Sequence, residues 1–202
     1  LSDNSIGGWA DDGTQAIGES LQYLTNLRIL DFSNNYIGNQ GDNGTQAIGE
    51  NLQHLISLQV LDLSNNLRIG SEGDNGTIAI GESLQYLSQL QTLDLSWNFI
   101  GLQGDKGTIA IGESLKYLTG LQTLDFSNNL IGYGEDTGTQ AIGEGLQYLT
   151  QLKALDLSMN NMVSGFVNIT NGILSLNKLQ SLYVQQIKVI SPPPSQLDLL
   201  KQ

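Results

Sequence analysis

A repeat with a period of about 31 residues constrains the fold of this chain more than any other feature. The segment LQTLDLSWNFIG at 90–101 recurs with few changes at 27–38, 58–70, 121–132 and 152–162. The leucines at its centre are Leu30, Leu61, Leu93, Leu124 and Leu155. The interval between them is constant except after Leu61, where it is longer by one residue. A fixed period of this size is typical of a solenoid, in which each coil contacts only its neighbours. We therefore expect stacked coils that share one core of leucines.

The first half of each coil has the periodicity of a helix. In the copy that starts at Gly13, apolar residues at Ala16, Ile17, Leu21 and Leu24 fall on one helical face, which predicts about three turns. The candidate N-caps are Asp12, Asn43, Asn75 and Thr137. In three copies a glutamine follows three residues later and could complete a capping box, at Gln15, Gln46 and Gln140. A glycine recurs inside every helix, at Gly18, Gly49, Gly81, Gly112 and Gly143. Because glycine disfavours helices, its recurrence predicts a close approach of neighbouring backbones.

The second half of each coil alternates apolar and polar residues and predicts a short strand. Leu93 and Leu95 should point into the core, and Thr92, Asp94 and Ser96 away from it. An asparagine follows each strand, at Asn35, Asn66, Asn98, Asn129 and Asn160. An amide side chain both donates and accepts, so these residues should satisfy backbone groups where the chain turns.

The pattern LxxLDLSxNxIG followed by GDxGTxAIGExL resembles the leucine-rich repeat superfamily, and within it the ribonuclease-inhibitor-like subclass. The resemblance extends from Leu1 to about Asn161, and the near-uniform copies are similar to bacterial or effector-type repeat proteins. It implies an α/β horseshoe, with a parallel sheet on the concave face and helices on the convex face. It also implies protein binding through the strand face and the adjoining loops.

The repeat divides the chain into three parts. Residues 1–12 read as a partial repeat, since Asn4 lies one full period before Asn35. Residues 13–165 form an array of about five coils, and residues 166–202 a degenerate last repeat with a cap. In this last part Ile187 replaces the asparagine, three prolines at 192–194 stop the pattern, and a short helix could run to Gln202. An open apolar end at residue 1 implies further repeats before it, or a partner that covers it.

Composition limits the partners and the chemistry. With a net charge of −12, nucleic acid and anionic lipid are disfavoured, and a protein with a basic surface is favoured. No apolar run is long enough to span a membrane. The chain has no cysteine, which excludes disulfides and thiolate metal sites and favours a cytoplasmic or host-delivered location over a secreted one.

No catalytic motif or cofactor site stands out. The single histidine, His54, stands where the other coils carry a tyrosine and should be a solvated or half-packed helix residue. The glycine-rich fragments lack the context of a dinucleotide site. A column of aspartates follows the strands, at Asp31, Asp62, Asp94, Asp125 and Asp156. It offers too few oxygen ligands for calcium, and the neighbouring serines should donate hydrogen bonds to it. We expect neither an enzyme nor a resident cofactor or metal.

The candidate binding residues are outward positions that differ between otherwise identical coils. They lie before and after the asparagine column and comprise Tyr36, Arg68, Trp97, Phe99, Leu102, Leu130, Tyr133 and Met159. Aromatic residues ringed by polar ones are typical of interface hot spots, although such side chains could instead pack on one another between coils. Asp94 and Asp125 are added as contacts for a basic partner.

Three functions follow from these features. The first is a non-enzymatic module that binds a partner protein through the concave face and the strand-end loops. The second, drawn from the resemblance, is the recognition segment of a larger effector or of a GTPase-activator-like protein. The third is a calcium-dependent surface adhesion module.

Overall fold

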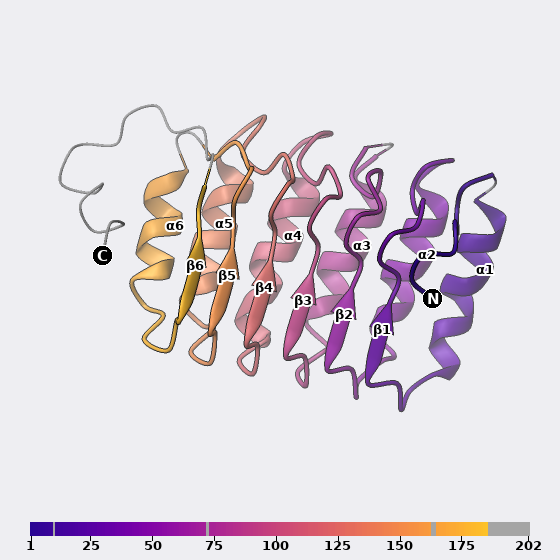
Figure 1. Cartoon of the computed structure of the whole chain (residues 1–202), viewed down its shortest axis with the longest axis horizontal. Coiled ribbons are helices and arrows are strands. Elements are labelled where there is room, and N and C mark those ends of the chain that lie inside the picture. The colour runs from indigo at the N-terminus through magenta and orange to yellow at the C-terminus, as the bar shows by residue number, and fades with distance from the viewer. Residues whose placement is uncertain (10, 72, 163–164, 186–202) are drawn as a thin grey trace.

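The described part of the chain forms six coils, each with one helix and one short strand (Figure 1). The computed structural model describes residues 1–9, 11–71, 73–162 and 165–185. The helices are α1 (Asp12–Ser20), α2 (Asn43–Leu52), α3 (Asn75–Leu84), α4 (Lys106–Ser114), α5 (Thr137–Leu146) and α6 (Phe166–Ile173), and the 3₁₀ turns η1 (Leu21–Tyr23) and η2 (Leu115–Tyr117) follow α1 and α4. The strands are β1 (Ile29–Asp31), β2 (Val60–Asp62), β3 (Thr92–Asp94), β4 (Thr123–Asp125), β5 (Ala154–Asp156) and β6 (Ser181–Tyr183). Coils 1 to 6 are numbered by their strands.

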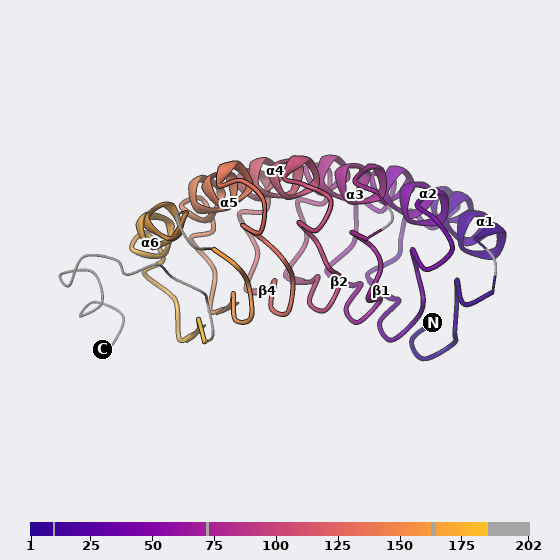
Figure 2. The ribbon, with the colours of Figure 1, turned by 90° about the horizontal axis from the view of Figure 1, so that it is seen from above.

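The strands form one parallel sheet whose order follows the sequence, β1-β2-β3-β4-β5-β6. Equivalent repeat positions are paired, so that Leu61 lies opposite Leu93 and Asp62 opposite Asp94. Seen from above, the molecule is an arc with the helices on the outer side and the strands on the inner side (Figure 2). The predicted α/β solenoid, with a concave parallel sheet and convex helices, is confirmed.

One continuous apolar core runs between the sheet and the helices. Leu93 and Leu95 of the strand half and Leu84 and Leu87 of the helix half are fully buried. Side chains alternate across a strand, so Asp94 stays half-buried on the concave side. Burying one leucine contributes about 1.5–3 kcal/mol, and the repeat supplies several in every coil. The core is therefore a line along the arc, with a similar cross-section at each coil.

The glycine inside each helix lies against the backbone of the next helix, as predicted. A Cβ atom on Gly81 would lie 2.6 Å from the Ile111 nitrogen and 2.7 Å from the Ala110 carbonyl carbon. Gly49 meets Ile80 in the same way, at 2.6 Å. These distances are too short for any side-chain carbon. Glycine is thus required for the spacing of the helices, although it weakens each helix taken alone.

The predicted N-caps are wrong, because the capping bond comes from the preceding coil. Asn43 is the first residue of α2, and Asp42 before it makes no side-chain bond to that helix. Instead, Asp11 Oδ2 accepts a hydrogen bond from the Gly44 amide (2.8 Å), and Asp42 Oδ2 accepts one from the Gly76 amide (3.0 Å). A carboxylate at a helix N-terminus satisfies an amide that has no partner within the helix.

The capping-box glutamines are likewise paired differently from the prediction. Gln46 Nε2 donates to Glu50 Oε1, one turn further along the same helix, at 2.7 Å. Gln15 and Gln140 make the same bond to Glu19 and Glu144. These pairs stabilise the exposed helix face and leave the helix start to the aspartate of the preceding coil.

At the N-terminal end of the sheet the core is partly uncovered. Ile29 is 62% exposed, and a cavity of about 510 Å³ is lined by apolar side chains that include Ile17 and Leu24. Residues 1–8 form a turn on coil 1, in which Asn35 Nδ2 donates to the Leu1 carbonyl (2.9 Å). The Asn4 amide in turn donates to Asn35 Oδ1 (3.0 Å).

The last coil keeps the architecture after the helix signature is lost. Helix α6 packs beside α5, and β6 continues the sheet, with Leu155 opposite Leu182 (Figure 1). The strand predicted at 179–184 is therefore confirmed in its central residues. Ile187, the prolines at 192–194 and the short helix expected up to Gln202 lie outside the described residues.

Candidate functional site

Apolar side chains gather where the strands end and the chain turns toward the next helix. We call this group the strand-end surface. It consists of Tyr36, Leu67, Trp97, Phe99, Leu102, Leu130, Tyr133 and Met159. All are exposed except Leu130, which is half-buried; Trp97 is 49% and Tyr133 60% exposed. Packing between coils therefore does not remove these side chains from water.

The asparagine column fixes the backbone beneath this surface. Asn98 is fully buried, and its Nδ2 donates to the carbonyls of Leu63 (2.9 Å) and Leu95 (3.0 Å). Its Oδ1 accepts a hydrogen bond from the Asn66 amide at 3.1 Å. One side chain thus joins coil 2 to coil 3 at the turn, which confirms the structural role predicted for this column.

Direct backbone bonds between coils bring the strand-end positions side by side. The Leu67 amide donates to the Trp97 carbonyl at 3.0 Å, and the Trp97 amide donates to the Ser127 carbonyl at 3.0 Å. The Leu130 amide donates to the Ile100 carbonyl at 2.9 Å. Equivalent turns are therefore stacked like the strands before them. Arg68 is exposed in the turn of coil 2, where the extra residue of the longest repeat falls.

Two aromatic residues of coil 3 adopt the left-handed backbone conformation. Trp97 and Phe99 both have φ of 57°. At the Trp97 position, coils 1, 2 and 4 carry Asn34, Asn65 and Asn128 with φ of 54–55°. Asparagine visits this region readily, whereas for other residues it costs roughly 1–2 kcal/mol. Coil 3 therefore holds a strained tryptophan where its neighbours use the residue that relieves the strain.

The aspartate column lies on the concave face beside this surface. Neighbouring strands pair Asp62 with Asp94 and Asp94 with Asp125, at a usual strand spacing of about 4.8 Å. Ser96 Oγ and the Ser96 amide both donate to Asp94 Oδ1, at 2.7 and 2.9 Å. These serine bonds were predicted and are confirmed. Within the described residues, Asp62, Asp94 and Asp125 form no ion pair.

Burial raises the pKa of the Asp94 carboxyl above its usual value of 3.8, and repulsion by Asp125 and Asp62 adds to this, against the hydrogen bonds from Ser96. Burial likewise raises the pKa of the Asp125 carboxyl, and repulsion by Asp156 and Asp62 raises it further. The hydrogen bonds from Ser127 act in the opposite direction and lower this pKa. Because the pKa in the folded state exceeds the unfolded value, the folded protein binds these protons more tightly. Ionised at neutral pH, both groups lower stability. That penalty fades as the pH falls through the folded pKa toward the unfolded one.

Replacing Asp94 and Asp125 with asparagine should therefore stabilise the protein at pH 7. We expect a gain of about 1 kcal/mol per relieved carboxylate contact, because the amide oxygen can still accept from the serine while the repulsion is removed. The advantage over wild type should shrink as the pH is lowered toward 4. Urea titrations across this pH range would measure it. A matched loss of charge on the convex face, Glu82→Gln with Glu113→Gln, is the control, and an equal gain in that variant would contradict the explanation.

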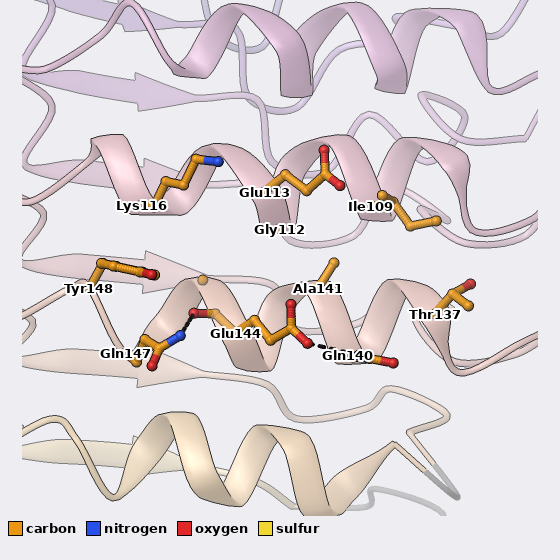
Figure 3. A pocket seen from close by; sticks show the side chains of 11 residues that line it. Ile109, Gly112, Glu113, Lys116, Thr137, Gln140, Ala141, Glu144, Gln147 and Tyr148 are labelled. Carbon is orange, nitrogen blue, oxygen red and sulfur yellow. Dashed lines mark hydrogen bonds between the residues drawn. The ribbon is translucent and has the colours of Figure 1, made fainter.

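The convex face carries open grooves between helices. One of about 580 Å³ lies between α4 and α5 and is lined by Ile109, Glu113, Lys116, Glu144 and Tyr148, among others (Figure 3). Within it, Gln140 Nε2 donates to Glu144 Oε1 at 2.8 Å. A second groove of about 320 Å³ lies between α3 and α4. Both grooves lie between neighbouring helices, so they follow from the regular spacing of the coils.

His54 is exposed, as predicted, and so are Tyr23, Tyr86, Tyr117 and Tyr148 in the same column. Among the described residues, no group of three or more His, Asp or Glu side chains is arranged to hold a metal ion. No described helix has the length and apolar character needed to cross a membrane.

Two features of this region were not predicted from the sequence. Leu67, next to Arg68, is exposed and has φ of 42°. The inter-coil caps were also missed, but a signal for them existed. The residue before each helix is aspartate in coils 1 to 5, whereas the predicted cap position varies and is Lys106 in coil 4.

With this geometry established, comparisons with known proteins name the repeat. Residues 23–41 and 54–73 match the family model described as Leucine Rich repeat. Both stretches contain a strand and the turn that follows it, in coils 1 and 2. The fold is a leucine-rich repeat solenoid. A search of curated proteins gave no match.

Two solved structures are similar in part. One is the octameric complex of Latrophilin 3 (Lec, Olf), Unc5D (Ig, Ig2, TSP1) and FLRT2 (LRR), with a TM-score of 0.36, 14% identity, and coverage of 83% of this chain and 64% of that chain. The other is a leucine-rich repeat protein of Leptospira interrogans, with a TM-score of 0.23, 14% identity, and coverage of 91% and 66%. This chain thus spans just under two thirds of each matched chain. The fold assignment depends on the coil geometry and not on these two likenesses.

Proposed function

We propose that this chain is a non-enzymatic protein–protein interaction module that binds its partner through the concave sheet and the strand-end surface. The observation that carries the proposal is the pair Trp97 and Phe99, two exposed aromatic residues that coil 3 holds in a strained backbone conformation. Strain of this kind is found at functional sites more often than elsewhere.

Comparison between coils supports this location. Positions that build the solenoid, such as the leucine core and the buried asparagines, are the same in nearly every coil. The strand-end positions differ, and the differences concentrate aromatic and large apolar side chains in coils 3 and 4. Tryptophan and tyrosine are enriched among the residues that dominate binding energy in protein interfaces. An exposed group of such residues on the inner side of an arc is suited to a protein partner.

The proposal extends to the subclass of the repeat. Coils 1 to 5 each place a regular α-helix on the convex side, which supports the ribonuclease-inhibitor-like type. In that arrangement the helices hold the strands in a curved row, and the inner face is left for recognition.

The test uses peptides selected from a random display library on the immobilised protein. We expect the variant Trp97→Asn with Phe99→Asn to bind the selected peptides at least about tenfold more weakly, because it removes both aromatic side chains. The fold should be retained, since coils 1, 2, 4 and 5 already carry asparagine at one of these two positions. Titration calorimetry gives the affinities and circular dichroism checks the fold.

The control variant removes two exposed aromatic residues from the convex face, Tyr86→Ser with Tyr148→Ser. Its affinity for the selected peptides should stay within about twofold of wild type. The proposal would be contradicted if the peptides bound the strand-end variant with normal affinity but bound the convex-face variant weakly. That result would place the binding site on the helices.

A further inference from the structure

Resting on the proposed function, we infer the chemistry of the partner. The bound segment carries an arginine or lysine next to an apolar anchor, with the anchor against the strand-end surface and the cation between Trp97 and the carboxylates of Asp94 and Asp125.

The first step is the placement of the carboxylates beside the ring. Asp94 ends β3, and Trp97 follows shortly after it on the same turn. On the other side, the Trp97 amide donates to the carbonyl of Ser127, and the Ser127 amide donates to Asp125 Oδ1 at 2.8 Å. Trp97 is thus tied to both coils that supply the two aspartates. Trp97 and the two aspartates therefore lie in adjacent coils at one edge of the sheet, within reach of one bound segment.

The second step is the cost of covering those carboxylates. Asp94 and Asp125 are half-buried, and in the described residues they have hydrogen-bond donors but no cation. An apolar partner would remove the remaining water from charges that already repel one another, without compensation. A partner with a positive group replaces that water with an ion pair. The surface therefore selects against wholly apolar and acidic segments.

The third step is the match between the cation and the ring. A guanidinium or ammonium group is attracted to the face of an indole, and arginine can stack on it while its donors reach a carboxylate. The exposed half of Trp97 and the acidic column offer these two contacts together. The net charge of −12 also speeds the encounter with a basic segment.

Tryptophan fluorescence can test this directly. The chain has two tryptophans, and Trp9→Phe leaves Trp97 as the only one. The probe is the synthetic peptide acetyl-Gly-Arg-Leu-Arg-Gly-amide, compared with the same peptide in which citrulline replaces both arginines, a change that removes the charge and keeps the shape. We expect the arginine peptide to bind at least about tenfold more tightly and to perturb Trp97 emission. Asp94→Asn with Asp125→Asn should remove that preference.

The control again neutralises two carboxylates on the convex face, Glu82→Gln with Glu113→Gln, so that net charge is matched. It should leave the preference within about twofold of its wild-type size. Equal binding of the two peptides, no binding of either in the millimolar range, or an equal loss in both charge variants would overturn the inference. If library peptides still require Trp97 and Phe99 in that case, the proposed function stands and only the cationic partner is rejected.

Discussion

Replacing Gly81 with alanine should lower the free energy of unfolding by about 2–3 kcal/mol, although the same change usually stabilises a helix. Gly81 lies in α3, and its added Cβ would stand 2.6 Å from the Ile111 nitrogen and 2.8 Å from the Ala110 Cβ. Neither neighbour can rotate away, because both contacts belong to the helix α4 backbone and its shortest side chain. The helices must separate, which opens the core on both sides. The urea midpoint would measure the loss.

The matched control is Gly13→Ala in the first turn of α1. Nothing lies within 4 Å of its added Cβ. Here the ordinary helix preference should act alone, with a gain of up to about 1 kcal/mol. If both alanine variants changed stability in the same direction and by similar amounts, the close approach of the helices would not be the reason for the repeated glycine.

Replacing Asn98 with alanine should cost about 3 kcal/mol. The carbonyl of Leu63 accepts from both Asn66 and Asn98, and that of Leu95 from both Asn98 and Asn129, at 2.9–3.0 Å. Each carbonyl would keep one donor, but the amide of the fully buried Asn66 would lose its acceptor. The variant also leaves a cavity where the amide stood. Chemical denaturation followed by circular dichroism would give the value.

Asn51→Ser supplies the comparison for that loss. Asn51 lies in α2, where its Nδ2 donates to the Ala47 carbonyl at 2.9 Å. Coils 1, 3 and 4 carry serine at this position, and the Ser20 hydroxyl donates to the equivalent carbonyl of Ala16. The change should therefore stay within about 0.5 kcal/mol. A cost as large as that of Asn98→Ala would mean that the asparagine column has no special role.

The architecture was predictable because repetition turns a local pattern into a global one. The constant spacing alone indicates that Leu61, Leu93 and Leu124 stack, and the sheet register agrees. Glycine inside a helix signalled a conflict with local preference, and its recurrence in every coil implies a contact between coils, which the structure supplies. The asparagine after each strand indicated a turn, and its bonds to the neighbouring coil add a second contact.

The geometry of the strand-end surface was harder to predict, for physical reasons. The sequence indicates that Trp97 differs from Asn34 and Asn128, but not that all three share one left-handed conformation. Exposure depends on how far the neighbouring coil reaches, so Leu130 is half-buried while Tyr133 is 60% exposed. The prediction of the helix caps was wrong because rules for capping consider one helix at a time. Here the capping hydrogen bond joins two coils and spans 33 or 34 residues.

Those caps bear on how such a chain can change its length. Coils 1, 2 and 4 each offer a carboxylate to a glycine amide of the next coil, as Asp105 Oδ2 and the Gly138 amide show at 3.0 Å. When a whole unit is duplicated or lost at the level of the gene, the two newly joined units meet with the same donor and acceptor, and no compensating substitution is needed. An insertion or deletion of part of a unit would instead leave one donor and one acceptor inside the protein without a partner. Gain or loss of whole units is thus the change that this architecture tolerates best.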